Sequence, residues 1–207
     1  TSELHYASWR EVLPRFGLDM TWEQHLATFG QNNAAILAHM TGEAGNPAWV
    51  EEVSQAKEQA FRRLARERAK ALPGAKAWLE RLQAWGIQQA VASSAPIENV
   101  QTLVEALGFS PYLDALVSGE HLPAKPDPAI FLEAARQLGV EPRHCLVVED
   151  AVVGVEGAKK AGMRALAVTT THDALALSAA DLVVKSLADI HEAQMRELLG
   201  FAGSLDR

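Results

Sequence analysis

The chain has 207 residues with 19 basic and 26 acidic side chains, which gives a formal net charge of −7 at pH 7. This length allows one large or two small domains, and the acidic balance argues against a nucleic-acid partner. No apolar run approaches the roughly 20 residues needed to cross a bilayer. Because the single cysteine excludes an internal disulfide and the start shows no signal-peptide pattern, we expect a cytoplasmic protein without membrane contact.

Apolar residues at helical spacing predict an all-helical region over roughly the first seventy residues. Polar caps mark the helix starts, and a glycine or a polar turn marks most of the ends. Basic residues on the last helix interleave with glutamates, which favours a solvated, ion-paired face. The first expected helix runs from Glu3 to Phe16 and is ended by Gly17. The others run from the capping box at Thr21 toward Phe29, from the turn at 30–33 to about Met40, and from Asn46-Pro47 to about Leu72.

From Leu72-Pro73-Gly74 onward, helical and strand patterns alternate. Such alternation is typical of a parallel sheet with helices on both faces. The sequence therefore predicts a helical domain over residues 1–71 and an α/β domain over residues 72–207. The expected strands cover residues 87–92, 115–117, 145–148, 164–168 and 182–184. The expected helices cover 75–85, 97–107, 127–138 and about 193–199, with one more between the acidic strand and Gly162.

One stretch, from Cys145 to Met163, combines a strand pattern with two adjacent carboxylates. A continuous apolar run, 145–148, predicts a strand that is buried on both faces. Glu149 and Asp150 follow it, and a helix rich in glycine and alanine comes next. Two neighbouring carboxylates repel each other unless a cation or donor pairs with them, so a divalent metal such as Mg²⁺ is one interpretation. A strand end that simply faces water is the other.

Polar residues follow three of the predicted strands at their carboxyl ends, which a parallel sheet gathers on one edge. Ser93-Ser94 follows one strand, Lys125 another, and Glu149 with Asp150 a third. Hydroxyl, ammonium and carboxylate groups together suit a phosphate and a metal ion. Each residue also has a plain structural explanation, such as a strand-end cap or a surface lysine. No aspartate of the α/β region stands at a strand end as a phosphoryl-accepting nucleophile would.

Three segments in this order resemble motifs of the haloacid dehalogenase superfamily: VASSAP at 91–96, AKPDPAIF at 124–131 and VVEDAVVGVEGAKKAGM at 147–163. The chain is most similar to the branch of phosphatases and β-phosphoglucomutases with a helical cap. This resemblance implies an α/β fold with a Rossmann-like parallel sheet core and an N-terminal all-helical cap domain. The family's first motif, DxDG, supplies a nucleophilic and an acid/base aspartate, and would lie immediately upstream of Thr1.

The resemblance also implies roles for individual core residues. Ser93, with Ser94 beside it, matches the hydroxyl position that binds the transferring phosphoryl group. Lys125 matches the lysine that neutralises phosphate and nucleophile. Asp150 matches the Mg²⁺ ligand, and Glu149 is its acidic neighbour in the first or second coordination shell.

In the helical region, His5 matches a histidine near the acid/base aspartate of β-phosphoglucomutases, and Lys57 matches a lysine of related role. The arginine that mutases use for a second phosphate is replaced by Asn33, and their polar Ser-Lys-Asn by Ala95-Pro96-Ile97. These losses favour a phosphatase over a mutase. We expect a monomer that uses Mg²⁺ and acts on a small-molecule phosphate ester, such as a sugar or polyol phosphate. The resemblance further implies that the cap closes over the substrate.

Three alternatives stay open at this point. A phosphohexomutase of the β-phosphoglucomutase type shares most of the motifs. A non-catalytic binding protein would result if the first motif were absent from the natural protein. A receiver-type signalling domain could use Thr169 and Lys185, but it requires an aspartate at a strand end that this chain does not have.

Overall fold

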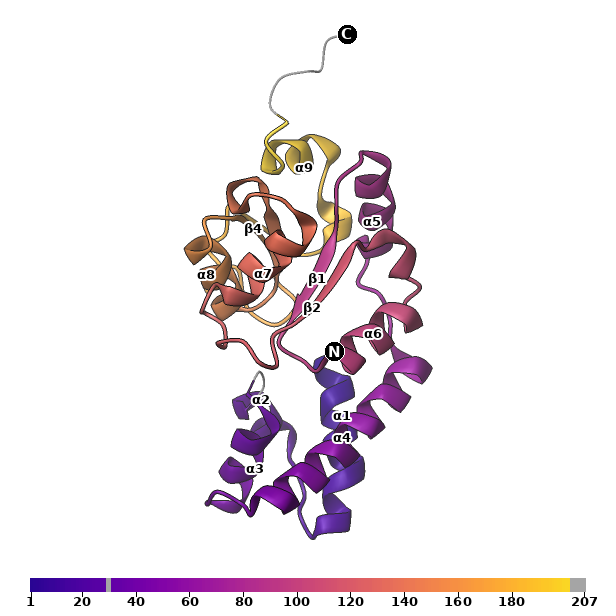
Figure 1. Ribbon diagram of the computed structural model, residues 1–207, viewed down its shortest axis with the longest axis vertical. Coiled ribbons are helices and arrows are strands. Elements are labelled where there is room, and N and C mark those ends of the chain that lie inside the picture. The colour runs from indigo at the N-terminus through magenta and orange to yellow at the C-terminus, as the bar shows by residue number, and fades with distance from the viewer. Residues whose placement is uncertain (29–30, 202–207) are drawn as a thin grey trace. The chain divides into compact units, whose positions relative to one another are not determined.

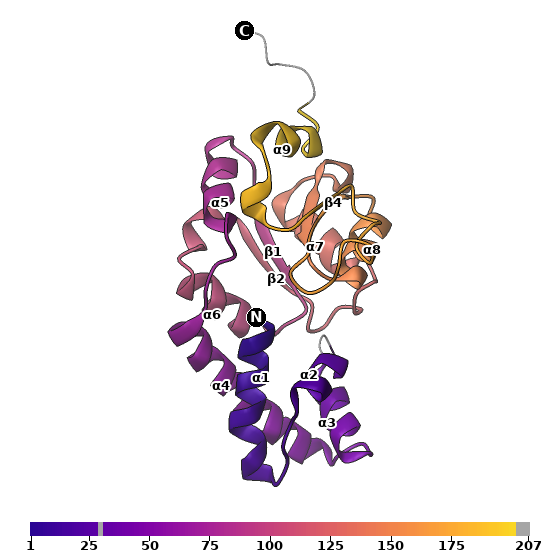
Figure 2. The same cartoon turned by 180° about the vertical axis from the view of Figure 1, so that it is seen from behind.

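The computed structural model describes residues 1–28 and 31–201, and Figures 1 and 2 show it from opposite sides. The chain divides into two compact units. The first comprises residues 1–70 together with 101–108, and the second comprises 71–100 and the chain from residue 109 onward. No helix in the described parts is both long enough and apolar enough to span a membrane.

The first unit is helical, and its helix boundaries follow from local sequence. Thr21 and Gln24 form the predicted capping box, with reciprocal bonds of 2.8 and 3.2 Å, and Asn46 accepts a 2.9 Å bond from the N–H of Ala48. The first α-helix ends at Val12, earlier than the expected Phe16, because Pro14 has no N–H to continue the α-helical hydrogen bonds. Its elements are α1 (Ser2–Val12), η1 (Leu13–Phe16), α2 (Trp22–Thr28), α3 (Asn33–Thr41) and α4 (Pro47–Arg68).

Helices α1 and α4 lie side by side in both views and enclose the core of the first unit (Figures 1 and 2). Their facing side chains include Trp9, Val53 and Phe61, none of which is more than 1% exposed. Helix α4 ends at Arg68 rather than near Leu72, because Ala69 turns to an extended backbone with ψ 135°. The predicted end of the second helix, at Phe29, lies outside the described residues.

The strands of the second unit all pair in parallel, as predicted, but they form two sheets instead of one. The first sheet pairs β1 (Ala90–Ser93) with β2 (Ala115–Ser118), and Ser93 lies opposite Ser118. The second has the order β3 (Leu146–Glu149), β4 (Arg164–Val168) and β5 (Leu182–Val184). Within the described residues β1 and β3 are not paired with each other, so each is an edge strand.

Helices cover both faces of these strands, as the alternating pattern predicted. Figures 1 and 2 show α5 on one side of β1 and β2, and α7 on the other. Phe131 of α7 and Val155 of α8 are buried in one core, and Trp78 of α5 and Met195 of α9 in another. The helices are α5 (Ala75–Ala84), α6 (Ile97–Ala106), α7 (Ala129–Leu138), α8 (Val152–Lys160) and α9 (Glu192–Leu198), with short 3₁₀ turns η2 (Ser110–Tyr112), η3 (Pro142–His144) and η4 (Leu187–Asp189).

Two strand predictions need correction. The acidic strand is not buried on both faces: Cys145 precedes it and Val148 is 48% exposed. The reason is that β3 is an edge strand, so one side of it has no neighbour in the described chain. The strand expected at 87–92 begins only at Ala90, because the backbone N–H of Gln89 donates to the side chain of Asp114 (2.8 Å) instead of to the backbone of a neighbouring strand.

Candidate functional site

Ser93 stands at the carboxyl end of β1, in a turn that leads into α6. Its Oγ accepts a 3.2 Å bond from the N–H of Ala95, and the hydroxyl of Ser118 fixes the same turn by donating to Ala95 O at 2.8 Å. Ser94 is exposed. The turn therefore presents a hydroxyl and backbone N–H groups just ahead of a ten-residue helix, an arrangement that suits an anion.

Lys125 and Glu149 form an ion pair that connects the loop after β2 with the end of β3. Their side chains are only 14% and 11% exposed. The second oxygen of Glu149 accepts from the N–H groups of Asp150 (3.1 Å) and Ala151 (3.3 Å), and the Lys125 ammonium lies 4.7 Å from the centre of the Phe131 ring. The carboxyl edges of the two sheets therefore meet at this pair, and Glu149 is occupied in holding the lysine.

Asp150 is held by the loop that follows β4. Thr170 Oγ1 donates a 2.8 Å bond to Oδ2 of Asp150, and Thr171 Oγ1 donates a 2.7 Å bond to its backbone oxygen. His172 Nδ1 lies 3.1 Å from the same backbone oxygen. The sequence analysis did not single out these three residues. The signal that would have found them is their place directly after a strand, at the same sheet edge as Asp150.

The side chains at this sheet edge suit Mg²⁺, which keeps several water ligands, better than a metal that is bound by protein ligands alone. In the described part of the chain no group of three or more His, Cys, Asp or Glu side chains could hold a metal ion. With Glu149 bound to Lys125, the carboxylate left for a cation is that of Asp150, and its Oδ1 takes no part in the bonds above. Mg²⁺ commonly binds through one or two carboxylates, several waters and a substrate phosphate.

The other three candidate residues, His5, Lys57 and Asn33, lie in the first unit, where they belong to one polar cluster around the buried Lys57. Lys57 is 3% exposed. Its ammonium is 3.0 Å from His5 Nδ1 and 2.8 Å from Glu58 Oε1, and Asn33 Nδ2 donates to the same Glu58 oxygen at 2.8 Å. The His5 ring stacks on Phe61 at 4.1 Å between ring centres. Glu58 was not predicted from the sequence, although it is the acid that joins Lys57 to Asn33.

The His5–Lys57 contact makes stability pH-dependent. Burial, and then the charge of Lys57, hold the pKa of His5 well below its ordinary value. The unfolded chain takes up a proton near pH 6.5 that folded His5 does not, so stability should fall as pH drops below about 6.5, by up to about 1.4 kcal/mol per pH unit. Urea unfolding at pH 7.0 and 5.5 measures this loss. The loss should be smaller in His5→Gln, and equal losses in both proteins would contradict the assignment.

Residues 2–162 match the haloacid dehalogenase-like hydrolase family. The chain is 36% identical over 118 residues to the validoxylamine A 7′-phosphate phosphatase of Streptomyces hygroscopicus subsp. limoneus, covering 56% of this chain and 55% of that protein. It is 29% identical over 169 residues to the fructose-1-phosphate phosphatase YqaB of Escherichia coli K12, covering 80% and 88%. The crystal structure of β-phosphoglucomutase from Clostridium difficile has a TM-score of 0.83 at 23% identity, covering 97% and 91%, which is a likeness of fold.

These matches cover more than half of the chain, and the chain belongs to the haloacid dehalogenase-like hydrolases. The resemblance noted in the sequence motifs is thereby confirmed at the level of the family. The α/β fold is confirmed as well, through its likeness to the β-phosphoglucomutase structure. The chain spans about half the length of the Streptomyces phosphatase, and 16% and 34% of two further relatives from Arabidopsis thaliana.

Proposed function

We propose that this chain forms the larger part of a Mg²⁺-dependent phosphatase that hydrolyses small sugar or polyol phosphate monoesters. The observation that carries the proposal is the Lys125–Glu149 pair beside Asp150, at the carboxyl ends of parallel strands. The relatives named as phosphatases of fructose 1-phosphate and of validoxylamine A 7′-phosphate support a small phosphorylated substrate. The phosphoryl acceptor in this proposal is an aspartate upstream of Thr1.

In the proposed reaction each core residue has a separate task. The hydroxyl of Ser93 and the N–H groups that follow it bind the oxygens of the transferring phosphoryl group. Lys125 offsets negative charge that builds up as the aspartate attacks phosphorus, and Glu149 keeps the ammonium directed at that position. Asp150 holds the Mg²⁺, which when bound neutralises phosphate charge and orients the oxygens.

We favour hydrolysis over transfer between sugar hydroxyls. A mutase must hold a bisphosphate during turnover and therefore needs fixed cations or donors at a second phosphate site. In this chain the Asn33 amide binds the carboxylate of Glu58, and Ala95-Pro96-Ile97 offers no polar side chain. Each lost hydrogen bond to a charged group costs on the order of 1.5–3 kcal/mol, so two or three losses weaken a bisphosphate complex by several orders of magnitude.

The test uses the complete enzyme, including the residues ahead of Thr1, with Mg²⁺ and fructose 1-phosphate or β-glucose 1-phosphate. Release of inorganic phosphate is the expected result. If glucose 6-phosphate accumulates faster than phosphate when catalytic bisphosphate is added, the enzyme is a mutase. If neither product forms from any sugar monophosphate, while the ester still binds, the non-catalytic alternative holds.

A single methyl group should disturb the ion pair of the site. Gly154 of α8 passes so close to Glu149 that a Cβ at this position would overlap the carboxylate, which Lys125 and Asp150 N–H already hold in place. We expect Gly154→Ala to lower kcat/KM of the complete enzyme roughly 10–100-fold, because a shift of about 1 Å in a charged group can cost about 100-fold.

The control is Val153→Ala on the same helix, whose side chain is 44% exposed. This variant changes the neighbouring side chain without adding an atom beside Glu149, so its steady-state kinetics should match those of the unmodified enzyme. If Gly154→Ala leaves kcat/KM unchanged, a displacement of Glu149 does not affect catalysis, and its contact with Lys125 has no role in turnover.

A further inference from the structure

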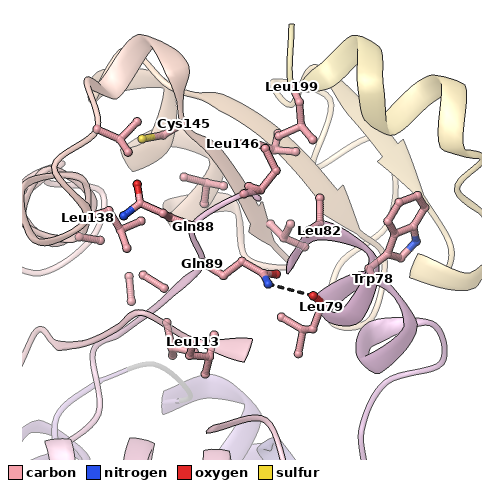
Figure 3. Close-up of a pocket in the computed structure, with 18 of the residues that line it drawn as sticks. Trp78, Leu79, Leu82, Gln88, Gln89, Leu113, Leu138, Cys145, Leu146 and Leu199 are labelled. Carbon is pink, nitrogen blue, oxygen red and sulfur yellow. Dashed lines mark hydrogen bonds between the residues drawn. The ribbon is translucent and has the colours of Figure 1, made fainter. Parts of the chain in front are cut away.

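Strand β1 is fixed at its start by the side chain of the residue before it. Gln89 is 8% exposed, and its amide donates to Leu79 O of α5 at 2.9 Å, the bond drawn dashed in Figure 3, and to Tyr112 O at 3.1 Å. From residue 90 to 93 the strand then pairs residue by residue with β2. The strand is therefore fixed in place, but the serine turn, residues 93–96, continues beyond it and needs support of its own.

That support comes from two consecutive residues at the carboxyl end of β2. The N–H of Gly119 donates to Ser93 O at 2.7 Å, and the hydroxyl of Ser118 donates to Ala95 O at 2.8 Å. Because the C=O and the N–H of one trans peptide group point in opposite directions, the first bond turns the N–H of Ser94 away from β2. The end of β2 therefore decides which way the serine turn presents its donors.

The hydroxyl of Ser118 makes a second bond, which joins the serine turn to the loop that carries Lys125. It accepts from the N–H of Glu120 at 3.2 Å, so one oxygen atom connects the turn with the first residues after β2. The two segments also pass close together, since a Cβ on Gly119 would lie only 3.3 Å from the Cα of Ser94. One hydroxyl therefore links the two segments of this sheet that the proposed reaction uses.

We propose that Ser118 is a positioning residue for phosphate, which holds the serine turn in a fixed place relative to Lys125 through its two hydrogen bonds. The inference rests on the proposed function, in which this turn binds the phosphoryl group and the lysine offsets its charge. Ser118 touches neither phosphate nor metal in this assignment. It acts because a turn that is already ordered loses little freedom when an anion binds. Without the hydroxyl, phosphate has to order the turn on binding, and the phosphorus atom is held less firmly against the lysine.

The test compares three variants of the complete enzyme. Ser118→Ala removes both bonds, and Ser118→Thr keeps the hydroxyl. Ser186→Ala is the matched control, because Ser186 Oγ also accepts from the N–H two residues ahead, that of Ala188 (3.1 Å), and donates to a distant carbonyl, that of Pro73 (3.4 Å). Affinity for inorganic phosphate in the presence of Mg²⁺ is measured by calorimetry, together with Mg²⁺ binding to the phosphate-free enzyme, steady-state kinetics and the melting temperature.

Ser118→Ala should weaken phosphate binding about tenfold and lower kcat/KM by about 10–100-fold, with Mg²⁺ binding unchanged because Asp150 is not touched. Ser118→Thr should bind phosphate like the unmodified enzyme. Both alanine variants should lower the melting temperature by about 2–4 °C, but Ser186→Ala should keep full phosphate affinity. Equal phosphate affinity in Ser118→Ala and the unmodified enzyme overturns the proposal, and so does an equal loss in Ser118→Thr or in Ser186→Ala.

Hydrogen exchange tests the same link without any variant. The N–H of Glu120 donates to the hydroxyl that holds Ala95 O, so phosphate that tightens the serine turn should slow exchange of this amide by at least about threefold. The amide of Ala188, which is bonded to Ser186, is the reference and should not change. If Glu120 exchange does not slow, the turn and the loop are not coupled through Ser118, which overturns the proposal even where Ser118→Ala fails to fold.

Phosphate release separates this inference from the proposed function. If the unmodified enzyme binds phosphate with Mg²⁺ but hydrolyses no sugar monophosphate, the proposed function fails, and the affinities of the variants still decide the role of Ser118. If it hydrolyses the ester, while Ser118→Ala and the unmodified enzyme bind phosphate equally, the proposed function stands and this inference fails. An unmodified enzyme that binds no phosphate overturns both.

Discussion

Replacing Asp150 by Asn in the complete enzyme should reduce kcat by more than about 100-fold and weaken Mg²⁺ binding, while the fold survives. Asn has the shape of Asp and can still accept the 2.8 Å bond from Thr170, so packing is preserved. It lacks the charge that binds a hard divalent cation, and residues that only orient a metal ligand are already worth roughly 10–100-fold. Kinetics at limiting and saturating Mg²⁺, with calorimetric Mg²⁺ titration, measure both effects.

Two further variants separate the effect of the Asp150 charge from the effect of the hydrogen bond that orients it. Thr170→Val removes the donor to Asp150 and should raise the Mg²⁺ concentration needed for half-maximal activity, with kcat nearly restored at high Mg²⁺. Asp189→Asn makes the same chemical change in the short turn η4, at an exposed carboxylate outside the proposed metal site. It should leave the kinetics unchanged. Near-normal activity of Asp150→Asn at limiting Mg²⁺ would remove Asp150 from the metal site.

Removing the ammonium of Lys125 should cost about 100–1000-fold in kcat, which is the usual loss for one group that stabilises transition-state charge. Lys125→Met also leaves the Glu149 carboxylate, 11% exposed, without its cation, so the melting temperature should fall as well. Glu149→Gln should lose roughly tenfold in activity, because the amide can still accept from the ammonium and holds it less firmly.

The double variant Lys125→Met, Glu149→Gln decides whether the two residues act as a unit. If Glu149 acts through the lysine, the double variant should be no less active than Lys125→Met alone, and it should be more stable because no buried charge is left unpaired. If instead the losses of activity in the two single variants multiply in the double variant, Glu149 acts on substrate or metal independently of the lysine.

Local chemistry decided how much of this fold could be predicted. The boundaries of β4 and β5 were predicted to the residue, and glycines at 86, 139 and 162 end their helices with φ between 66° and 74°. The capping box at Thr21 is also confirmed. These features depend on a few neighbouring residues and on backbone rules that hold in any fold.

The incorrect predictions depend on partners distant in sequence. The apolar run before Glu149 predicted a strand buried on both faces. Val148 is exposed because β3 has a strand neighbour only at β4 in the described chain, and solvent reaches its side chains from the open edge. In the same way, sequence brought Lys125 and Glu149 to one edge but could not show that they pair, nor that Thr170 would hold Asp150. Glu58 was missed because an acid beside a lysine on a helix usually pairs in solvent, whereas here both side chains are largely buried.

The division of the strands into two sheets has a consequence for how this protein assembles. Each sheet is built from one contiguous piece of sequence, residues 90–118 for β1 with β2 and 146–184 for β3 to β5, so each can form from contacts of short range. The open edges of β1 and β3 are therefore exposed to aggregation until the two pieces that carry them have come together.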